Sequence, residues 1–340
     1  MKVVVVAPVG VPLPVKGYGG IEIAAQDLAT ELARRGHEVT LMGNVDDGPS
    51  PMGWAGRRIL TEADPLTPDK YGLLRDADVV QDLSHGKAAR LARTRQYWAT
   101  TMFSDGQGPP GRNIYPSEAV RDSFKDPKAP VVPLGIPLDG VSVADPVPGR
   151  YVALGRVAPY KGQDLAIRVV RSVRAAEEQR DTEHLMHNPN PVSLTVAGHT
   201  GPFADAYFSL AVRKMCRDNG FDFVPDPPDL NALLDGAAGL LHLHRWVESF
   251  SLVAANALLR GIPILTTDVG APQEFVRACD GGFVVPLKDL EAGRPEALAI
   301  ARGFFEERWS SRRAGIAKRA RELFDVRVIA EKYETLYGGK

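Results

Sequence analysis

The chain has 340 residues, of which 44% are apolar and 24% are charged. This length predicts two domains of roughly 100–200 residues each, and the composition is that of a globular protein with a sizeable core. A formal net charge of −1 excludes a general attraction to nucleic acid or to an anionic membrane.

The sequence contains no stretch that approaches the roughly 18 apolar residues needed to cross a membrane. Its short apolar start, residues 3–7, predicts a buried first strand and not a signal peptide. The two cysteines, Cys216 and Cys279, stand far apart without a metal or redox spacing. We therefore expect buried thiols, a reducing compartment and a cytoplasmic protein.

Short apolar runs alternate with helical patterns along the chain, which predicts parallel α/β sheets. After the first strand, apolar residues at helical spacing predict a helix from Ile21 that Gly36 caps. Ser117 is the expected N-cap of a later helix that contains Arg121 and Phe124. Further strands of the first half are expected at residues 38–42, 78–83, 97–103 and 113–115.

A proline-rich stretch, residues 136–150, predicts a linker between two domains. We place the first domain at residues 1–140, the linker at 141–150 and the second domain at 151–322. A surface loop is expected at residues 181–191. Strands of the second domain are expected at residues 151–157, 193–198, 221–224, 239–244, 262–266 and 282–286.

Two segments of the second half carry charges that suit a diphosphate with a sugar attached. In G-R-V-A-P-Y-K-G (155–162), Arg156 follows an apolar strand and Lys161 is expected in the first turn of the next helix. This spacing lets two cations converge on one anion at the carboxyl edge of a sheet. In E-S-F-S-L-V-A-A-N (248–256), Glu248 comes just before a predicted helix N-terminus, whose free amides suit a phosphate.

The same side chains have plainer interpretations. Arg156 and Lys161 also suit surface cations, and Glu248 suits a carboxylate that stabilises a helix dipole by roughly 0.3–1 kcal/mol. We favour ligand contacts for the two cations because Gly155 and Gly162 flank them and permit a close backbone approach.

Together these segments resemble the donor site of the retaining glycosyltransferases of family four. The donor domain of that family carries a strand ending G-R-x-x-x-x-K-G and, later, E-x-F-G-L-x-x-x-E-A. The resemblance extends from Y-G-G-I-E (18–22) to Y-E-T-L-Y (333–337). It implies the GT-B fold: two Rossmann-like, doubly wound α/β domains with an interdomain cleft, and a terminal helix within residues 323–340 that crosses back to the first domain.

The resemblance also implies roles for the residues of the second segment. Glu248 would bind hydroxyls of the donor sugar, and the amides of Phe250, Ser251 and Leu252 would meet the phosphate, with Ser251 in place of the motif's glycine. Asn256 stands where the motif has its second glutamate, which holds the ribose. We expect the Asn256 amide either to hold the ribose more weakly or to pair inside the protein.

The loop at residues 8–20 follows the first strand but lacks the G-x-G-x-x-G spacing of a dinucleotide site, so a nicotinamide cofactor is not expected. Gly19 and Gly20 have two interpretations. They either start a helix after a plain connector or let backbone amides approach the anion of a bound donor.

Histidines supply the remaining candidates. His85, in a loop after a strand, is expected to contact the donor sugar or to assist proton movement, although a lone histidine is more often structural. His199, in another loop at the end of a strand, is expected to line the donor pocket. His242 and His244 share one face of a strand, as a metal pair would, but no third ligand is evident.

A basic stretch near residue 90 is expected to be a solvated helix face, with an acidic acceptor or a membrane surface as the alternative. Its cations are Lys87, Arg90, Arg93 and Arg95.

These observations predict a metal-independent, retaining glycosyltransferase in which His85 and Glu248 act in catalysis. The donor is expected to be a nucleotide sugar such as a UDP-, dTDP- or GDP-sugar, and no cofactor or nucleic acid is expected. The acceptor, a small molecule or a glycan, would lie around Gly19, Gly20, His85 and the loop at residues 104–108. Two alternatives stay open: another GT-B enzyme on nucleotide sugars (an epimerase or a phosphorylase), and a catalytically silent binding subunit.

Overall fold

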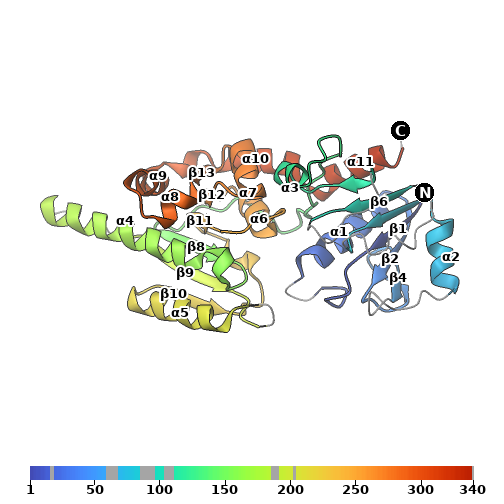
Figure 1. Cartoon of the computed structure of the whole chain (residues 1–340), viewed down its shortest axis with the longest axis horizontal. Coiled ribbons are helices and arrows are strands. Elements are labelled where there is room, and N and C mark those ends of the chain that lie inside the picture. The colour runs from blue at the N-terminus through green and yellow to red at the C-terminus, as the bar shows by residue number, and fades with distance from the viewer. Residues whose placement is uncertain are drawn as a thin grey trace. The chain divides into compact units, whose positions relative to one another are not determined.

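A computed structural model of the chain describes residues 1–15, 19–58, 68–84, 96–102, 111–184, 191–201 and 204–338. The chain divides into two compact units (Figure 1). One unit consists of Met1–Asp139 together with Glu322–Lys340, and the other is Gly140–Arg321. The last residues of the chain therefore complete the unit that the first residues begin.

The N-terminal unit is built on a sheet with the strand order β3-β4-β2-β1-β5-β6-β7. All neighbours pair in parallel except the edge strand β3, which is antiparallel to β4. Without β3 the order is that of a doubly wound α/β sheet. The strands are β1 (Lys2–Val6), β2 (Glu38–Gly43), β3 (Gly48–Pro49), β4 (Ala55–Arg58), β5 (Val79–Asp82), β6 (Tyr97–Thr100) and β7 (Asn113–Ile114).

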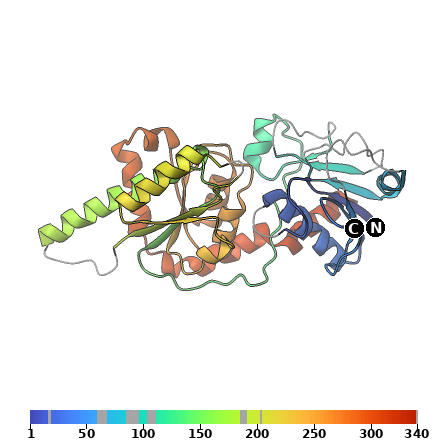
Figure 2. The ribbon, with the colours of Figure 1, turned by 90° about the horizontal axis from the view of Figure 1, so that it is seen from below.

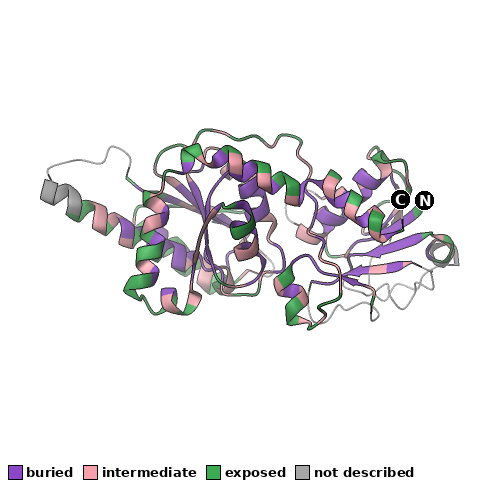
Figure 3. Cartoon of the chain, turned by 90° about the horizontal axis from the view of Figure 1, so that it is seen from above, coloured by how far each residue is buried: buried purple, intermediate pink, exposed green. Residues whose placement is uncertain are grey.

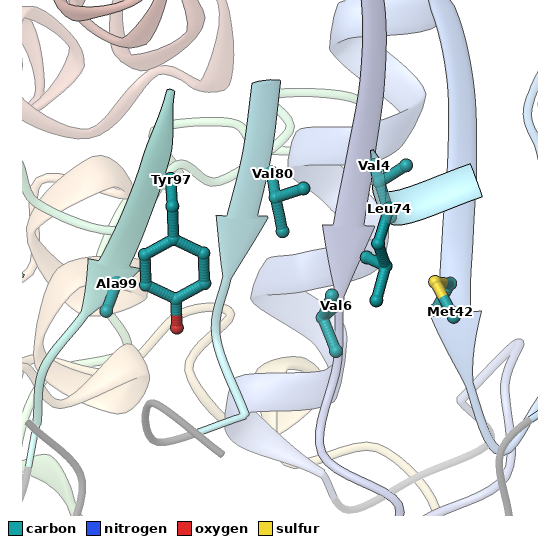
Figure 4. Close-up of a cluster of buried hydrophobic side chains, with 7 residues drawn as sticks. All are labelled: Val4, Val6, Met42, Leu74, Val80, Tyr97 and Ala99. Atoms are coloured by element: carbon teal, nitrogen blue, oxygen red, sulfur yellow. The ribbon is translucent and has the colours of Figure 1, made fainter. Parts of the chain in front are cut away.

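Apolar side chains on the strands of this sheet form a core cluster with the helix α2 (Figure 4). Val4 and Val6 of β1 lie between Met42 of β2 and Val80 of β5, and all are buried. The helices of the unit are α1 (Gly20–Arg34), α2 (Pro68–Asp76), α3 (Glu118–Ser123) and α11 (Val326–Leu336). The expected N-cap is confirmed, because Ser117 Oγ accepts a hydrogen bond from the Val120 amide.

The terminal helix α11 is joined to this unit by buried tyrosines. Tyr337 donates a hydrogen bond to Gln81 Oε1 over 3.1 Å, and the Tyr333 hydroxyl lies 3.1 Å from Thr100 Oγ1. Both tyrosine side chains are only 1% exposed, which shows that α11 covers the sheet as part of the core.

The C-terminal unit is a wholly parallel sheet with the order β10-β9-β8-β11-β12-β13. This is the doubly wound order 3-2-1-4-5-6, in which successive strands are added on one side of β8 up to β10 and on the other side from β11 onward. The inner strands are largely buried, the edge strands β10 and β13 are more exposed, and helices cover the sheet (Figures 2 and 3). The strands are β8 (Arg150–Leu154), β9 (Ser193–Gly198), β10 (Asp222–Pro225), β11 (Gly239–His242), β12 (Ile264–Thr267) and β13 (Gly282–Val285).

The helices of this unit follow its strands in the alternating pattern expected from the sequence. They are α4 (Gln163–His184), α5 (Ala206–Asp218), α6 (Leu252–Leu259), α7 (Ala271–Cys279), α8 (Leu287–Glu291), α9 (Pro295–Glu306) and α10 (Arg313–Phe324), the last of which runs across the boundary of the two units.

Several expected boundaries were wrong. β8 ends at Leu154 and not at residue 157, because Gly155 adopts φ 133° and turns the chain out of the strand. α4 continues to His184, so the expected loop at 181–191 begins too early. α3 ends at Ser123, which leaves Phe124 as its C-cap. The short strands β3 and β4 and the helix α2 were not anticipated.

Candidate functional site

The first part of the site is the turn that follows β8. Arg156 comes directly after Gly155, and its Nη1 donates a hydrogen bond to the Tyr160 hydroxyl over 3.0 Å. The buried Gln163 side chain, 2% exposed, donates to the Arg156 carbonyl over 2.8 Å and holds the turn from below. The turn is therefore held by a side chain of its own, Tyr160, and by the first residue of α4.

The sequence predicted Lys161 in the first turn of α4, but the structure places it before this helix. It ends a 3₁₀ turn, η2 (Pro159–Lys161), and Gly162 separates this turn from the helix in the left-handed conformation (φ 70°). A Cβ atom on Gly162 would come within 1.8 Å of the Leu243 carbonyl oxygen. Glycine is thus required at position 162 for two reasons: the left-handed backbone conformation and the close contact with the chain after β11.

The second part of the site is the segment between β11 and α6. Glu248 does not open this helix but precedes its first residue, Leu252, by four positions. Its carbonyl accepts a hydrogen bond from the Ala271 amide over 2.9 Å. A Cβ atom on Gly270 would lie 2.5 Å from the Glu248 amide nitrogen, so the start of α7 packs directly against this segment.

The structure brings Lys161 and Glu248 together. Lys161 Nζ lies 2.5 Å from Glu248 Oε2, although 87 residues separate them in sequence. The side chains are 19% and 16% exposed, so the pair is partly shielded but reachable from solvent. With Arg156 it places two cations and one carboxylate beside the point where the strand order reverses, which is where open α/β sheets bind ligands.

Arg245 is a site residue that the sequence interpretation missed. It makes a bidentate ion pair with Asp164 at the start of α4, with Nη1–Oδ1 and Nη2–Oδ2 distances of 2.8 Å. Its Nη1 also donates to the Pro159 carbonyl over 2.7 Å, and its Nε pairs with Glu291 over 2.6 Å. These carboxylates raise the pKa of Arg245 further above its usual range, with the Asp164 hydrogen bond as the largest cause.

The third part of the site is the N-terminus of α6, which begins at Leu252. Ser251 is its N-cap, with Oγ accepting from the Ala254 amide over 3.3 Å, and it has φ 73°, where glycine is favoured. The first intrahelical bond runs from the Ala255 amide to the Ser251 carbonyl. The amides of Leu252 and Val253 therefore precede that bond and point out of the helix end. The Phe250 side chain packs on Phe275 in the core.

His242 and His244 do not form a metal pair. His242 Nε2 lies 3.1 Å from Ser251 Oγ, and burial lowers the pKa of His242 well below its usual value, helped by His244 and Lys161. Both ring nitrogens of His244 face carbonyl oxygens, Nδ1 that of His242 and Nε2 that of Val269. Among the described residues, no group of three histidine, cysteine or acidic side chains is placed to hold a metal ion.

His199 lies at the end of β9, next to the Arg156 turn, where its carbonyl accepts from the Val157 amide over 2.9 Å. Its Nδ1 lies 2.8 Å from Asp226 Oδ1. The pKa of Asp226 lies below its usual value, mainly because the Thr200 hydroxyl and amide donate hydrogen bonds to its carboxylate. The Asp226 partner was not predicted, because nothing in a single sequence pairs the ends of β9 and β10.

Asn256 is committed to contacts inside the protein. Its Nδ2 donates to the Leu252 carbonyl over 3.0 Å, and its Oδ1 accepts from Arg260 Nη1 over 3.1 Å. Arg260 in turn pairs with Asp235 over 3.1 Å. Of the two expectations for Asn256, the observed contacts agree with pairing inside the protein.

The remaining predicted residues belong to the N-terminal unit. Gly19 is the N-cap of α1 and Gly20 its first residue, so the pair does start a helix. His85, the basic stretch at 87–95 and the loop at 104–108 lie outside the described residues. No helix in the described ranges is long and apolar enough to cross a membrane.

Comparison with known sequences finds similarity within the second unit. The family model described as "Glycosyl transferases group 1" matches residues 144–299. D-inositol 3-phosphate glycosyltransferase of Corynebacterium efficiens is 29% identical over 159 residues, 46% of this chain and 33% of the relative. The enzyme of the same name from Nocardia farcinica is 31% identical over 145 residues, 41% of this chain and 30% of the relative. The match thus spans about a third of the length of these curated relatives.

Solved structures match the whole chain. AviGT4, a glycosyltransferase involved in avilamycin A biosynthesis, superimposes with a TM-score of 0.73 at 23% identity, over 99% of this chain and 97% of that one. Sucrose-phosphate synthase from Thermosynechococcus elongatus gives 0.70 at 19% identity, over 99% and 98%. Anabaena HepE in complex with UDP-glucose gives 0.64 at 16% identity, over 99% and 100%. The expected GT-B fold is confirmed.

Proposed function

We propose that the protein transfers a sugar from a nucleotide diphosphate to an acceptor hydroxyl, with retention of the anomeric configuration, because residues 144–299 match the model of the glycosyl transferases group 1 family. The observation that carries the proposal is the ion pair of Lys161 with Glu248, four residues before α6, with Arg156 in the turn that leads to Lys161. Cations and helix amides suit the diphosphate, and a carboxylate suits the hydroxyls of the sugar.

In this proposal the chemistry is carried by charge stabilisation. Negative charge develops on the leaving diphosphate, and groups that already point at it lower the barrier without rearranging. Arg156, Lys161 and the amides of Leu252 and Val253 take that role, and no metal ion takes part. Glu248 holds the sugar in the orientation from which the acceptor attacks.

The comparisons support a nucleotide-sugar donor. HepE was solved with UDP-glucose bound, which favours uridine among the expected bases. The two curated relatives are named for transfer to D-inositol 3-phosphate, but their match lies within less than half of this chain. From these names we include a small polar acceptor in the proposal. We also propose a cytoplasmic location, because nucleotide sugars would be available there.

The direct test is a panel of UDP-, dTDP- and GDP-sugars scored by thermal shift, followed by donor hydrolysis without acceptor. A ligand at 100 times its dissociation constant adds about 2.7 kcal/mol to stability, which is readily seen in such a scan. Binding with slow hydrolysis is expected of a transferase. Binding without any turnover would indicate the silent subunit, and binding of none would refute the donor site.

A further inference from the structure

The ion pair between Lys161 and Glu248 joins groups with two different proposed partners. Lys161 would hold the diphosphate and Glu248 the sugar, yet the structure directs the ammonium at the carboxylate over 2.5 Å. An ammonium of this kind has three donor hydrogens and one charge. A phosphate that approaches Lys161 therefore also approaches a carboxylate that already uses this cation.

The contact is set by a rigid frame around Arg245. The Arg245 amide donates to the Tyr160 carbonyl and its Nη1 to the Pro159 carbonyl, both over 2.7 Å, which fixes the turn that carries Lys161. Arg245 itself belongs to the segment that carries Glu248. Because the guanidinium is also clamped to Asp164, the turn and the segment form one body.

The far side of Glu248 is fixed as well. Its carbonyl is held by the Ala271 amide, and Gly270 packs on its backbone with no room for a side chain. With both backbones held, the ion pair can separate only by rotamer changes of the two side chains, and the Glu248 carboxylate then needs a new partner for its charge in a partly buried place.

We propose that Glu248 competes with the diphosphate for Lys161 and thereby makes the site discriminate a sugar nucleotide from the nucleoside diphosphate product. This inference rests on the donor site of the proposed function. A sugar nucleotide brings hydroxyls that donate to Glu248 and replace Lys161, so the ammonium turns to the phosphates. The product lacks the hydroxyls of the donor sugar and has an additional ionised oxygen on its terminal phosphate. Glu248 therefore repels the product or forms the ion pair with Lys161 again.

Arg245 acts in this scheme as a positioning residue. Its guanidinium is engaged by Asp164, Glu291 and the Pro159 carbonyl, and it keeps the turn at Lys161 and the segment at Glu248 in register. Without its bidentate clamp the two parts move independently, and the competition weakens because Glu248 no longer stays within reach of Lys161.

The test measures nucleoside diphosphate affinity by calorimetry, with UDP, dTDP and GDP as probes, in Glu248→Gln, Lys161→Met and the double variant. Glutamine has the shape of glutamate without the charge. We expect Glu248→Gln to bind the diphosphate about three- to tenfold more tightly than the unchanged protein, the range of a partly exposed charge contact. In the Lys161→Met background the same change should have an effect below about twofold.

Two controls separate the inference from general effects. Glu296→Gln removes an exposed carboxylate of the same unit and should leave diphosphate affinity unchanged. Arg245→Met should abolish the coupling between positions 161 and 248, whereas a purely structural role of Arg245 would lower the melting temperature and leave that coupling intact.

The outcomes distinguish this inference from the donor site itself. Unchanged or weaker diphosphate binding by Glu248→Gln, with a normal loss in Lys161→Met, overturns the competition and leaves the donor site standing. Equal affinity in the unchanged protein and in Lys161→Met overturns both. A gain in Glu248→Gln that persists in the Lys161→Met background also contradicts the inference, because it would show a general charge effect.

Discussion

The side-chain oxygen of Asn256 accepts a hydrogen bond from Arg260 at 3.1 Å, four residues further along the chain. The family motif has a glutamate at position 256, and a carboxylate there would pair with this arginine as an ion pair. Arg260 is only 8% exposed, so its charge depends on the partners around it. The amide and the guanidinium thus form a unit, and the nucleotide preference of the site can be tested through it.

We predict that Asn256→Glu shifts the preference towards ribonucleotides. A carboxylate accepts hydrogen bonds from both ribose hydroxyls, and a charge-assisted bond is roughly twice as strong as a neutral one. The ratio of UDP to dTDP affinity, measured by calorimetry, should therefore rise on substitution. An unchanged ratio would show that the side chain at position 256 serves only Arg260, and Asn256→Gln is the neutral control.

The two cations of the site should each matter for the donor. Arg156→Ala and Lys161→Ala are expected to weaken nucleotide-sugar binding and to slow transfer by about tenfold or more, because each removes a charge-assisted contact of roughly 1.5–3 kcal/mol. Lys214→Ala, at a 67% exposed lysine of α5, is the matched control. Equal affinities in all three variants would mean that the diphosphate binds elsewhere.

Transfer should continue in EDTA. The proposal assigns the charge on the leaving diphosphate to Arg156, Lys161 and the α6 amides, so removal of divalent ions should change the initial rate by less than about twofold. The measurement is a rate with and without chelator, followed by addition of magnesium or manganese. Complete loss of activity that either ion restores would contradict this assignment.

Asp27 gives the protein a stability that depends on pH. Burial raises the pKa of the Asp27 carboxyl to about 7, whereas the pKa of an aspartate in the unfolded chain is about 4. Because the folded protein holds this proton more tightly than the unfolded chain, Asp27 contributes its full share to the free energy of unfolding below about pH 4. This share is lost as the pH rises to about 7. Asp27→Asn should therefore raise the melting temperature at pH 8.

The gain from Asp27→Asn should shrink as the pH falls and vanish near about pH 4, where the aspartate is protonated in both states. Its expected size at pH 8 is about 1–3 kcal/mol, below the full value of the pKa shift because the side chain is only partly buried. Asp139→Asn, at an exposed aspartate of the same unit, should show no such trend. A gain that is independent of pH would contradict the assignment.

The strands and the charged residues of the site were predictable, because buried strands and loops after strands leave a local pattern in the sequence. Arg156, Lys161 and Glu248 were named from such patterns, and the Ser117 cap likewise. Arg245 was not, since its partners Asp164 and Glu291 come from distant elements that only the folded chain brings together. The same holds for the contact of Asn256 with Arg260, because a helical spacing does not say which way an amide turns.

The terminal helix has a consequence for how the chain is made. Its buried tyrosines, Tyr333 and Tyr337, hydrogen-bond to strands β6 and β5, whose partner residues are synthesised 233 and 256 residues earlier. On the ribosome that surface of the first sheet stays uncovered until residues 326–337 have emerged. The second sheet lies within one continuous stretch and needs no such delay. The half that begins synthesis first is therefore the half that finishes folding last.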